Sequence, residues 1–286
     1  NVQFAYHSKT QDYILIEVNP RVSRSSALAS KATGIPIARI STMLSLGNML
    51  HELSNRVTGN TSAAFEPSID YIVTKIPRWP FDKFKLANRE LGTQMKSTGE
   101  TMSIGRSFEE SLMKAWRSIG QGIGYPEDVE WSQSELELKI RVPNDQRLLA
   151  IWAYLRKNRA TQENIERTCE LSEFHPFFID RIAKLVKLEI ELSESKHKLD
   201  KELLLRAKKN GFGDKQIAHL TNKSQKEIRN QRKTNKIKST FLIVDTCAGE
   251  FEAKTPYFYS TYADKPINID IGKSIVILGS GPIRIG

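Results

Sequence analysis

The residues whose types and spacing are best suited to chemistry lie in one short run, Ile14–Ile37, which begins as an apolar strand and ends as a helix. Glu17 and Asn19 are two residues apart, so on a strand both side chains project to the same face. Their oxygen atoms are ligands of the kind that hard divalent cations prefer. Arg21 and Arg24 follow, and guanidinium groups bind phosphates through paired hydrogen bonds. The run therefore predicts a site for a metal ion and a nucleotide.

A hairpin is predicted to position this site. A register that pairs His7 with Tyr13 sets Gln3 opposite Glu17, so Gln3 becomes a third oxygen-bearing side chain beside the pair. Taken alone, a Glu-x-Asn pattern also fits an ordinary strand end at the surface, and the arginines could form ion pairs that steady the loop. The predicted strands, separated by a polar stretch, are Asn1–Tyr6 and Tyr13–Asn19.

The first 121 residues alternate predicted strands and helices, which is typical of α/β or α+β architecture. Gly34 ends the first predicted helix, and Ser25 and Ser26 stand at its start, where we expect them to cap it. Ser107 with Glu110 three residues later fits a capping box. The predicted helices are Ser25–Thr33, Ile37–Leu46 and Phe108–Ile119, and the strands are Ile69–Ile76, ended by Pro77 and Pro80, and Thr101–Ile104.

Glycine and proline residues concentrated at 120–143 predict a domain boundary. Downstream of it, apolar residues recur at helical spacing, so we expect a mainly α-helical domain. A strand-like segment at 241–245 and an aromatic segment at 257–262 close this domain, and 274–278 opens a new strand. The predicted helices are Arg147–Lys157, Glu163–Leu171, Pro176–Ser193, Lys201–Lys209, Lys215–Leu220 and Gln225–Lys233.

Composition fits a soluble globular protein of 286 residues, with 39% hydrophobic and 27% charged residues. That length is enough for two ordinary domains. No apolar run reaches about 18 residues, which argues against a transmembrane helix. Cys169 and Cys247 lack CxxC spacing, so a disulfide framework or zinc site is disfavoured and a reducing compartment is favoured.

The net charge of +10 is concentrated at 195–238, which holds 14 Lys and Arg residues against four Asp and Glu residues. Such a segment can bind nucleic acid, bind an acidic partner or form a solvated face, and we favour the solvated face. The alternative function is a helix–turn–helix module for nucleic acid within 200–238. Its two helices and turn would lie in Asp214–Lys233.

Five segments together resemble the large subunit of carbamoyl phosphate synthetase, in the order found in that family. The Glu17 run resembles the end of the first ATP-grasp domain. Residues 122–238 carry few motifs and match by position and helical character. The other motifs are FEPSIDYIVTKIPRWPFDKF at 65–84, TQMKSTGETMSIGRSFEESLMKA at 93–115, VDTCAGEFEAKTPYFYSTY at 244–262 and IVILGSGPIRIG at 275–286.

The resemblance implies that Glu17 bridges two Mg²⁺ or Mn²⁺ ions held by the phosphates of ATP, with Asn19 and Gln3 as further metal ligands. It implies that Arg24 and Arg21 grip bicarbonate, the γ-phosphate or carboxyphosphate. The expected reaction is phosphorylation of bicarbonate by ATP, after which ammonia attacks carboxyphosphate. The protein contributes by positioning and charge stabilisation.

The resemblance also implies a multidomain fragment of a longer cytoplasmic protein, although an organellar location stays open. The expected domains are the C-terminal part of the carboxyphosphate ATP-grasp domain at 1–121, a helical oligomerisation domain at 122–270, and the start of the carbamoyl phosphate half at 271–286. The glycine turn at Gly279, Gly281 and Gly286 belongs to that last part, and we assign it no chemistry. The fragment alone is not expected to be active.

The expected partners are a glutamine amidotransferase, as a small subunit or a fused domain, and other copies of the large subunit. Phe174, Phe177 and Phe178 are candidates for the contact between copies, and core packing is the alternative role for them. Neither a membrane nor nucleic acid is favoured as a partner. The amidotransferase arrangement, the allosteric effectors and the choice between arginine and pyrimidine synthesis remain open.

Overall fold

The computed structural model describes residues 1–195, 198–247, 253–255, 257–263, 275 and 283–284. The chain divides into two compact units. The first unit comprises Asn1–Asp70 with Phe241–Tyr259, and the second comprises Tyr71–Thr240 with Ser260–Gly286. The predicted domain limits at 121/122 and 270/271 stay predictions. The predicted strand at 274–278 and the turn at Gly279, Gly281 and Gly286 lie outside the described residues, apart from Ile275.

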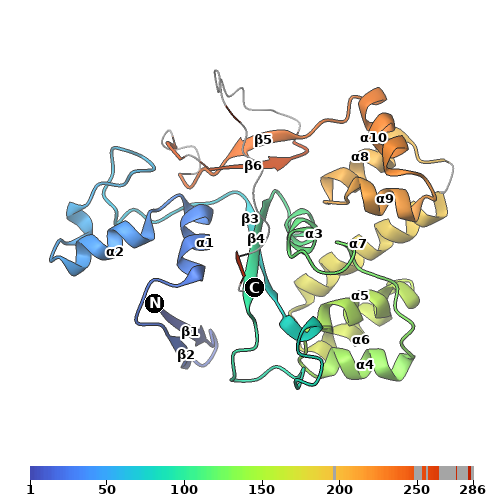
Figure 1. Cartoon of the computed structure of the whole chain (residues 1–286), viewed down its shortest axis with the longest axis horizontal. Helices are drawn as coiled ribbons and strands as arrows, with labels where there is room; N and C mark the ends of the chain where they lie inside the picture. The colour runs from blue at the N-terminus through green and yellow to red at the C-terminus, as the bar shows by residue number, and fades with distance from the viewer. Residues whose placement is uncertain (196–197, 248–252, 256, 264–274, 276–282, 285–286) are drawn as a thin grey trace. The chain divides into compact units, whose positions relative to one another are not determined.

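The first unit opens with the predicted hairpin, formed by β1 (Val2–Tyr6) and β2 (Tyr13–Val18) (Figure 1). Gln3 pairs with Glu17, as predicted, but Tyr13 pairs with Tyr6 and not with His7. The register shifts between Gln3 and Phe4, where β2 holds one extra residue, Ile16. This β-bulge restores the pairing of Gln3 and Glu17 although the turn is one step out of the predicted register.

Helix α1 (Arg24–Thr33) follows, and its cap corrects the prediction. Ser23, not Ser25, is the N-cap residue, and its hydroxyl accepts from the Ser26 N–H while the Ser26 hydroxyl accepts from the Ser23 N–H. Gly34 ends the helix with a φ of 70°, in the left-handed region that favours glycine. The unit continues with α2 (Ile37–Ser45) directly after Pro36, and a short 3₁₀ turn, η1 (Leu50–Glu52).

The sheet of the second unit consists of three antiparallel strands in the order β3-β4-β7. Their bounds are β3 (Ile72–Arg78), β4 (Gly99–Gly105) and β7 (Ile283–Arg284). The prediction that Pro77 ends β3 is wrong, because the strand runs through it to Arg78. Proline cannot donate a ladder hydrogen bond, and it is tolerated here because β3 lies at the edge of the sheet.

Helix α3 (Phe108–Ser118) packs on β3 and β4 (Figure 1). Ser107 caps it as predicted, with its hydroxyl accepting from the Glu110 N–H at 3.2 Å. The predicted reciprocal bond is wrong. The Glu110 carboxylate accepts from the Arg106 N–H at 2.8 Å and from the Thr261 hydroxyl at 3.0 Å. Glu110 therefore ties the start of α3 to Thr261, a residue of the same unit that is distant in sequence.

The helices of the second unit agree closely with the predicted ones downstream of 143. Helix α4 was not predicted, because it lies within the stretch 120–143, whose glycine and proline residues predict a domain boundary. A 3₁₀ turn, η2 (Pro80–Asp82), follows β3. The helices are α4 (Gln133–Arg141), α5 (Arg147–Lys157), α6 (Gln162–Ser172), α7 (Pro176–Ser195), α8 (Lys201–Lys209), α9 (Asp214–Leu220) and α10 (Gln225–Thr234).

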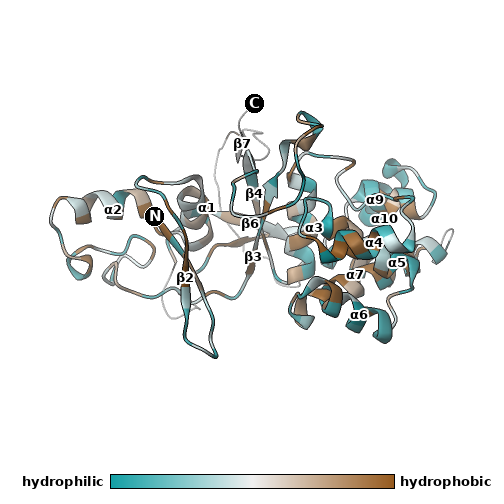
Figure 2. Cartoon of the chain, turned by 90° about the horizontal axis from the view of Figure 1, so that it is seen from below, coloured by the Kyte–Doolittle hydropathy of each residue, from teal (hydrophilic) through white to brown (hydrophobic). Residues whose placement is uncertain are grey.

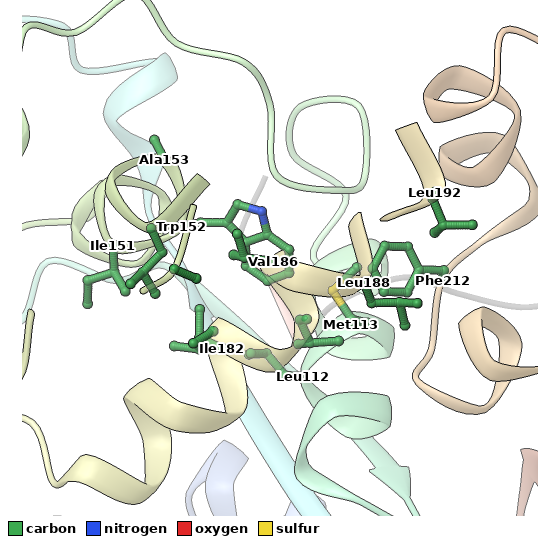
Figure 3. Packing of buried hydrophobic residues seen from close by; sticks show 14 of the residues in the cluster. Leu112, Met113, Ile151, Trp152, Ala153, Ile182, Val186, Leu188, Leu192 and Phe212 are labelled. Carbon is green, nitrogen blue, oxygen red and sulfur yellow. The ribbon is translucent and has the colours of Figure 1, made fainter. Parts of the chain in front are cut away.

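The core of the second unit lies where α3, α5 and α7 meet. Figure 3 shows Met113, Trp152, Val186 and Phe212 converging there, and all four are buried. In Figure 2 hydrophobic colour is prominent on the ribbon around α3 and α7, while much of α9 carries hydrophilic colour. The predicted α/β part and helical part are thus both present, with mixed helices and small antiparallel sheets.

Strands β5 (Thr240–Ile243) and β6 (Phe258–Thr261) pair as a separate two-stranded sheet. Strand β5 agrees with the strand-like segment predicted at 241–245, whereas β6 lies in the segment 257–262, which was singled out only as aromatic. Within the described part of the chain, none of the helices combines the length and the apolar character needed to cross a bilayer.

Candidate metal and phosphate site

The hairpin brings the three predicted oxygen-bearing side chains together. Gln3 and Glu17 are paired across the two strands, and Asn19 follows β2 directly. The Asn19 side-chain amide donates to the Glu17 carboxylate at 2.8 Å. This bond confirms that the two side chains share one side of the strand end, as the spacing predicts. It also leaves the Asn19 amide oxygen and the second Glu17 oxygen as acceptors for another group.

The backbone extends the hairpin beyond β2. The Asn19 N–H donates to the Asn1 carbonyl at 2.8 Å. The Asn1 side-chain amide donates to the Ser23 hydroxyl at 3.2 Å and to the Ser26 hydroxyl at 3.3 Å. The capping residues of α1 are therefore bonded to the base of the hairpin. Asn1 and Ser23 were not among the predicted site residues, although the Ser-x-x-Ser pattern before an apolar run was a signal for the cap.

Arg21 lies in the short connection between the hairpin and α1. Its N–H donates to the Asn19 carbonyl at 2.7 Å, and its guanidinium donates to the Val22 carbonyl at 3.4 Å. Among the described residues no carboxylate lies within ion-pair distance of Arg21, so an ion pair that steadies the loop finds no support here. The side chain is exposed and keeps most of its five donors available.

Arg24 is the first residue of α1, directly after the cap. The structure therefore places its backbone at the positive end of the helix, where free N–H groups favour anions. Its side chain falls outside what the structure describes. Glu17, Asn19, Arg21 and the start of α1 thus follow one another along a single short connection.

The donor set fits a hard divalent cation, although only one member is charged. In the described part of the chain, no three or more His, Cys, Asp and Glu side chains gather as metal ligands would. A cation at the hairpin would therefore rely on Glu17 and on the neutral amide oxygens of Asn19 and Gln3. Such a set binds a cation best when a further anion, such as a nucleotide phosphate, supplies the missing negative charge.

Several charged side chains of the basic helices α8 to α10 form ion pairs with one another. The Asp214 carboxylate accepts from the Lys208 ammonium at 2.8 Å and from the Arg232 guanidinium at 2.6 Å. These two cations are thereby taken up within the unit. Exposed basic residues such as Arg229 keep the helix–turn–helix interpretation an open prediction.

Phe174, Phe177 and Phe178 are all partly exposed, which lies between the two predicted alternatives. Phe177 and Phe178 pack edge-to-face on each other and on Phe108. Each keeps 43% of its surface exposed. The guanidinium of Arg147 lies over the ring of Phe174 at 4.7 Å, and that of Arg181 over Phe177 at 5.1 Å.

Two family models match this chain. One, described as the oligomerisation domain of the carbamoyl-phosphate synthetase large chain, matches residues 100–236. The other, described as the ATP binding domain of the carbamoyl-phosphate synthase L chain, matches residues 1–53 and so includes the hairpin and α1. The two matches follow the order that the sequence motifs predict.

Curated relatives extend the similarity over the whole chain. The chain is 47% identical to the carbamoyl phosphate synthase large chain of Methanothermobacter thermautotrophicus, with 100% of this chain and 26% of the relative aligned. The large chain of Methanothrix thermoacetophila is 50% identical, with the same shares aligned. The "Carbamoyl phosphate synthase large chain, N-terminal section" of Methanopyrus kandleri is 49% identical over 93% of this chain and 49% of its own length. The chain thus spans between about a quarter and a half of these relatives.

Proposed function

The chain belongs to the family of carbamoyl phosphate synthase large chains, and on this basis we propose that it acts within an ATP-dependent ligase. The enzyme would make carbamoyl phosphate from bicarbonate, ATP and ammonia derived from glutamine. This chain would contribute the end of a carboxyphosphate ATP-grasp domain and an oligomerisation domain. An amidotransferase subunit or domain would supply the ammonia.

In this proposal the hairpin holds the cations that accompany ATP. Glu17, Asn19 and Gln3 would ligate Mg²⁺ or Mn²⁺, whose bound charge offsets the negative charge on the phosphate groups. Arg21 and Arg24 would bind bicarbonate or carboxyphosphate and hold it in line with the phosphate. The work of these residues is therefore orientation and charge neutralisation, and no covalent bond to the protein is needed.

The observation that carries the proposal is the local geometry at Glu17. Its carboxylate receives the Asn19 amide at 2.8 Å and lies on the residue paired with Gln3. The exposed guanidinium of Arg21 lies only a few residues further along the chain.

The test is bicarbonate-dependent ATP hydrolysis by the intact large chain that contains these residues. Glu17→Gln should lower the rate by more than about a hundredfold at saturating Mg²⁺, because the amide removes the only charged ligand of the site. Glu163→Gln, the same substitution at an exposed position of α6, is the matched control and should leave the rate unchanged. Near wild-type hydrolysis by Glu17→Gln would refute the proposed role.

For the helical part we propose a contact between copies of the large chain. The support is the matched oligomerisation domain together with the half-exposed Phe177 and Phe178. Aromatic side chains that keep part of their surface in water are enriched in interfaces between proteins.

A further inference from the structure

A pocket of about 470 Å³ opens in the second unit between α3, the α8–α9 connection, α10 and β6. Five cationic side chains line it. They come from elements far apart in sequence, since α3 lies about a hundred residues before α8. The cations are Lys114, Arg117, Lys208, Lys215 and Arg232.

Two carboxylates also line the pocket, and both have their acceptor oxygens in use. Asp214 accepts from Lys208 at 2.8 Å and from Arg232 through two nitrogens at 2.9 and 2.6 Å. Glu110 accepts from the Arg106 N–H and the Thr261 hydroxyl, and lies 3.5 Å from the Lys114 ammonium. Five positive charges therefore face two negative charges, and the two carboxylates offer little to a further donor.

Two of the cationic side chains, Lys208 and Arg117, are closely surrounded by protein. Only 8% of the Lys208 side chain is exposed, and its ammonium also donates to the Phe212 carbonyl and lies 5.5 Å from the Tyr262 ring centre. Arg117 donates to the Gly211 carbonyl, and among the described residues no carboxylate lies within ion-pair distance of it. Most of the five donors of Arg117 are therefore unused, although its side chain lines a cavity that solvent can enter.

The electrostatics of the pocket favour an incoming anion. Burial lowers the pKa of Lys208 to about 8 and also lowers the pKa of Arg117, so both groups hold their charge against a desolvation penalty. An anion among them would offset that penalty. Arginine forks and lysine ammonium groups are the side chains that bind phosphate oxygens most strongly.

We propose that this pocket binds a phosphate group, either as free orthophosphate or as the phosphomonoester of a small metabolite. The excess of positive charge on the lining, together with the unused donors of Arg117, suits a multivalent oxyanion. The Tyr262 hydroxyl and the Gln225 amide on the pocket wall add neutral donors. This site shares no residue with the hairpin, and the proposal does not depend on the function proposed for Glu17.

The test is equilibrium dialysis of the intact large chain with ³²P-labelled orthophosphate, without Mg²⁺ or nucleotide. Arg117→Gln should weaken one class of phosphate sites by about tenfold or more, as expected for a lost charge-assisted hydrogen bond. Arg229→Gln makes the same change at an exposed position of α10 outside the pocket and should bind as wild type. Phosphate sites elsewhere in the protein contribute equally to both variants, so their difference isolates this pocket.

A second pair of variants guards against misfolding, because Arg117 also bonds the Gly211 carbonyl. Lys215→Gln at the exposed rim should weaken the same sites, and Lys226→Gln on α10 should not. Displacement of the label by AMP would identify a phosphomonoester site, and displacement only by orthophosphate and sulfate would identify a free-ion site. Equal phosphate binding by Arg117→Gln, Lys215→Gln and their controls would overturn the proposal.

Discussion

Lys208 is an ammonium group that the protein keeps almost fully out of water. Burial lowers its pKa from 10.5 to about 8, against the opposing effects of the hydrogen bond and charge of Asp214. The neighbouring guanidinium groups of Arg117 and Arg232 lower the pKa further, and the Tyr262 ring covers one side. At this residue, stability and ligand binding are therefore coupled to pH.

We predict that Lys208 makes the second unit more stable as the pH rises from 8 toward 10.5. The unfolded chain holds the Lys208 proton up to a pKa of about 10.4, while the folded chain releases it near pH 8. Lys208→Met removes this dependence. The free energy of unfolding of wild type relative to Lys208→Met should therefore rise by roughly 2 kcal/mol between pH 7.5 and pH 10. Urea unfolding at both pH values measures it, and an unchanged difference would show that Lys208 titrates normally.

Gly211 follows α8, and its backbone lies close against α3. Its φ is 87°, and a Cβ there would lie 2.9 Å from the Glu110 carbonyl oxygen and 2.9 Å from the Met113 Cβ. Its own carbonyl accepts from Arg117. The close approach of α3 therefore depends on the absence of a side chain at this position.

We predict that Gly211→Ala lowers the free energy of unfolding by about 3 kcal/mol, because left-handed strain and overpacking against α3 add together. Gly124→Ala is the matched control in the same unit. Gly124 has nearly the same φ, 86°, but its nearest neighbour would be 3.8 Å away, so only the strain of about 1 kcal/mol remains. Chemical denaturation measures both, and equal losses would show that contact with α3 is unimportant.

The capping box of α4 gives a second prediction for an element. The Ser132 hydroxyl accepts from the Glu135 N–H, and the Glu135 carboxylate accepts from the Ser132 N–H at 2.7 Å. Ser132→Ala should destabilise the unit by about 1 kcal/mol, whereas Ser132→Asp should keep most of the stability because aspartate also caps well. Thermal unfolding compares the two. Alanine and aspartate variants with the same midpoint would argue that the cap contributes nothing.

The elements show where sequence reasoning succeeds and where it fails. The predicted bounds of α5 and α8 match the observed ones. In both helices the apolar residues at helical spacing and the polar residues at the ends indicate the same bounds. Helix α4 was not predicted because it lies within the stretch 120–143 that was interpreted as a domain boundary, although the Ser132–Glu135 box marked its start. The packing of this segment is that of a helix, because Leu136 and Ile140 are buried on one side and Leu138 is exposed.

At the candidate site, the sequence indicated which side chains lie near one another, but not the irregular hairpin that holds them. Spacing and register indicated Gln3, Glu17 and Asn19, and the structure brings Glu17 and Asn19 into contact. The bulge at Ile16 could not be predicted, because a one-residue insertion leaves the apolar pattern of β2 almost unchanged. The basic pocket was also missed, because its five cations come from segments that only the fold brings together.

At the scale of the molecule, the cluster around Phe177 provides a test of assembly. Phe177 keeps 43% of its surface exposed and contacts Phe108 and Phe178. If this cluster lies in the contact between copies, Phe177→Ser should lower the mass of the intact large chain in light scattering. Phe241→Ser, at a comparably exposed phenylalanine of β5, is the control. An unchanged mass with Phe177→Ser would remove the cluster from the interface.

The sheet order β3-β4-β7 has a consequence for the order in which the chain is made. Gly99 and Glu100 of β4 pair with Arg284 and Ile283, which the ribosome adds about 180 residues later. At roughly 5–20 residues per second, one edge of β4 waits on the order of ten to forty seconds for its partner. During that interval a nascent chain exposes unpaired backbone groups that invite pairing with another strand. Early packing of α3 on the other elements of the sheet would protect this intermediate while the helical part is still being synthesised.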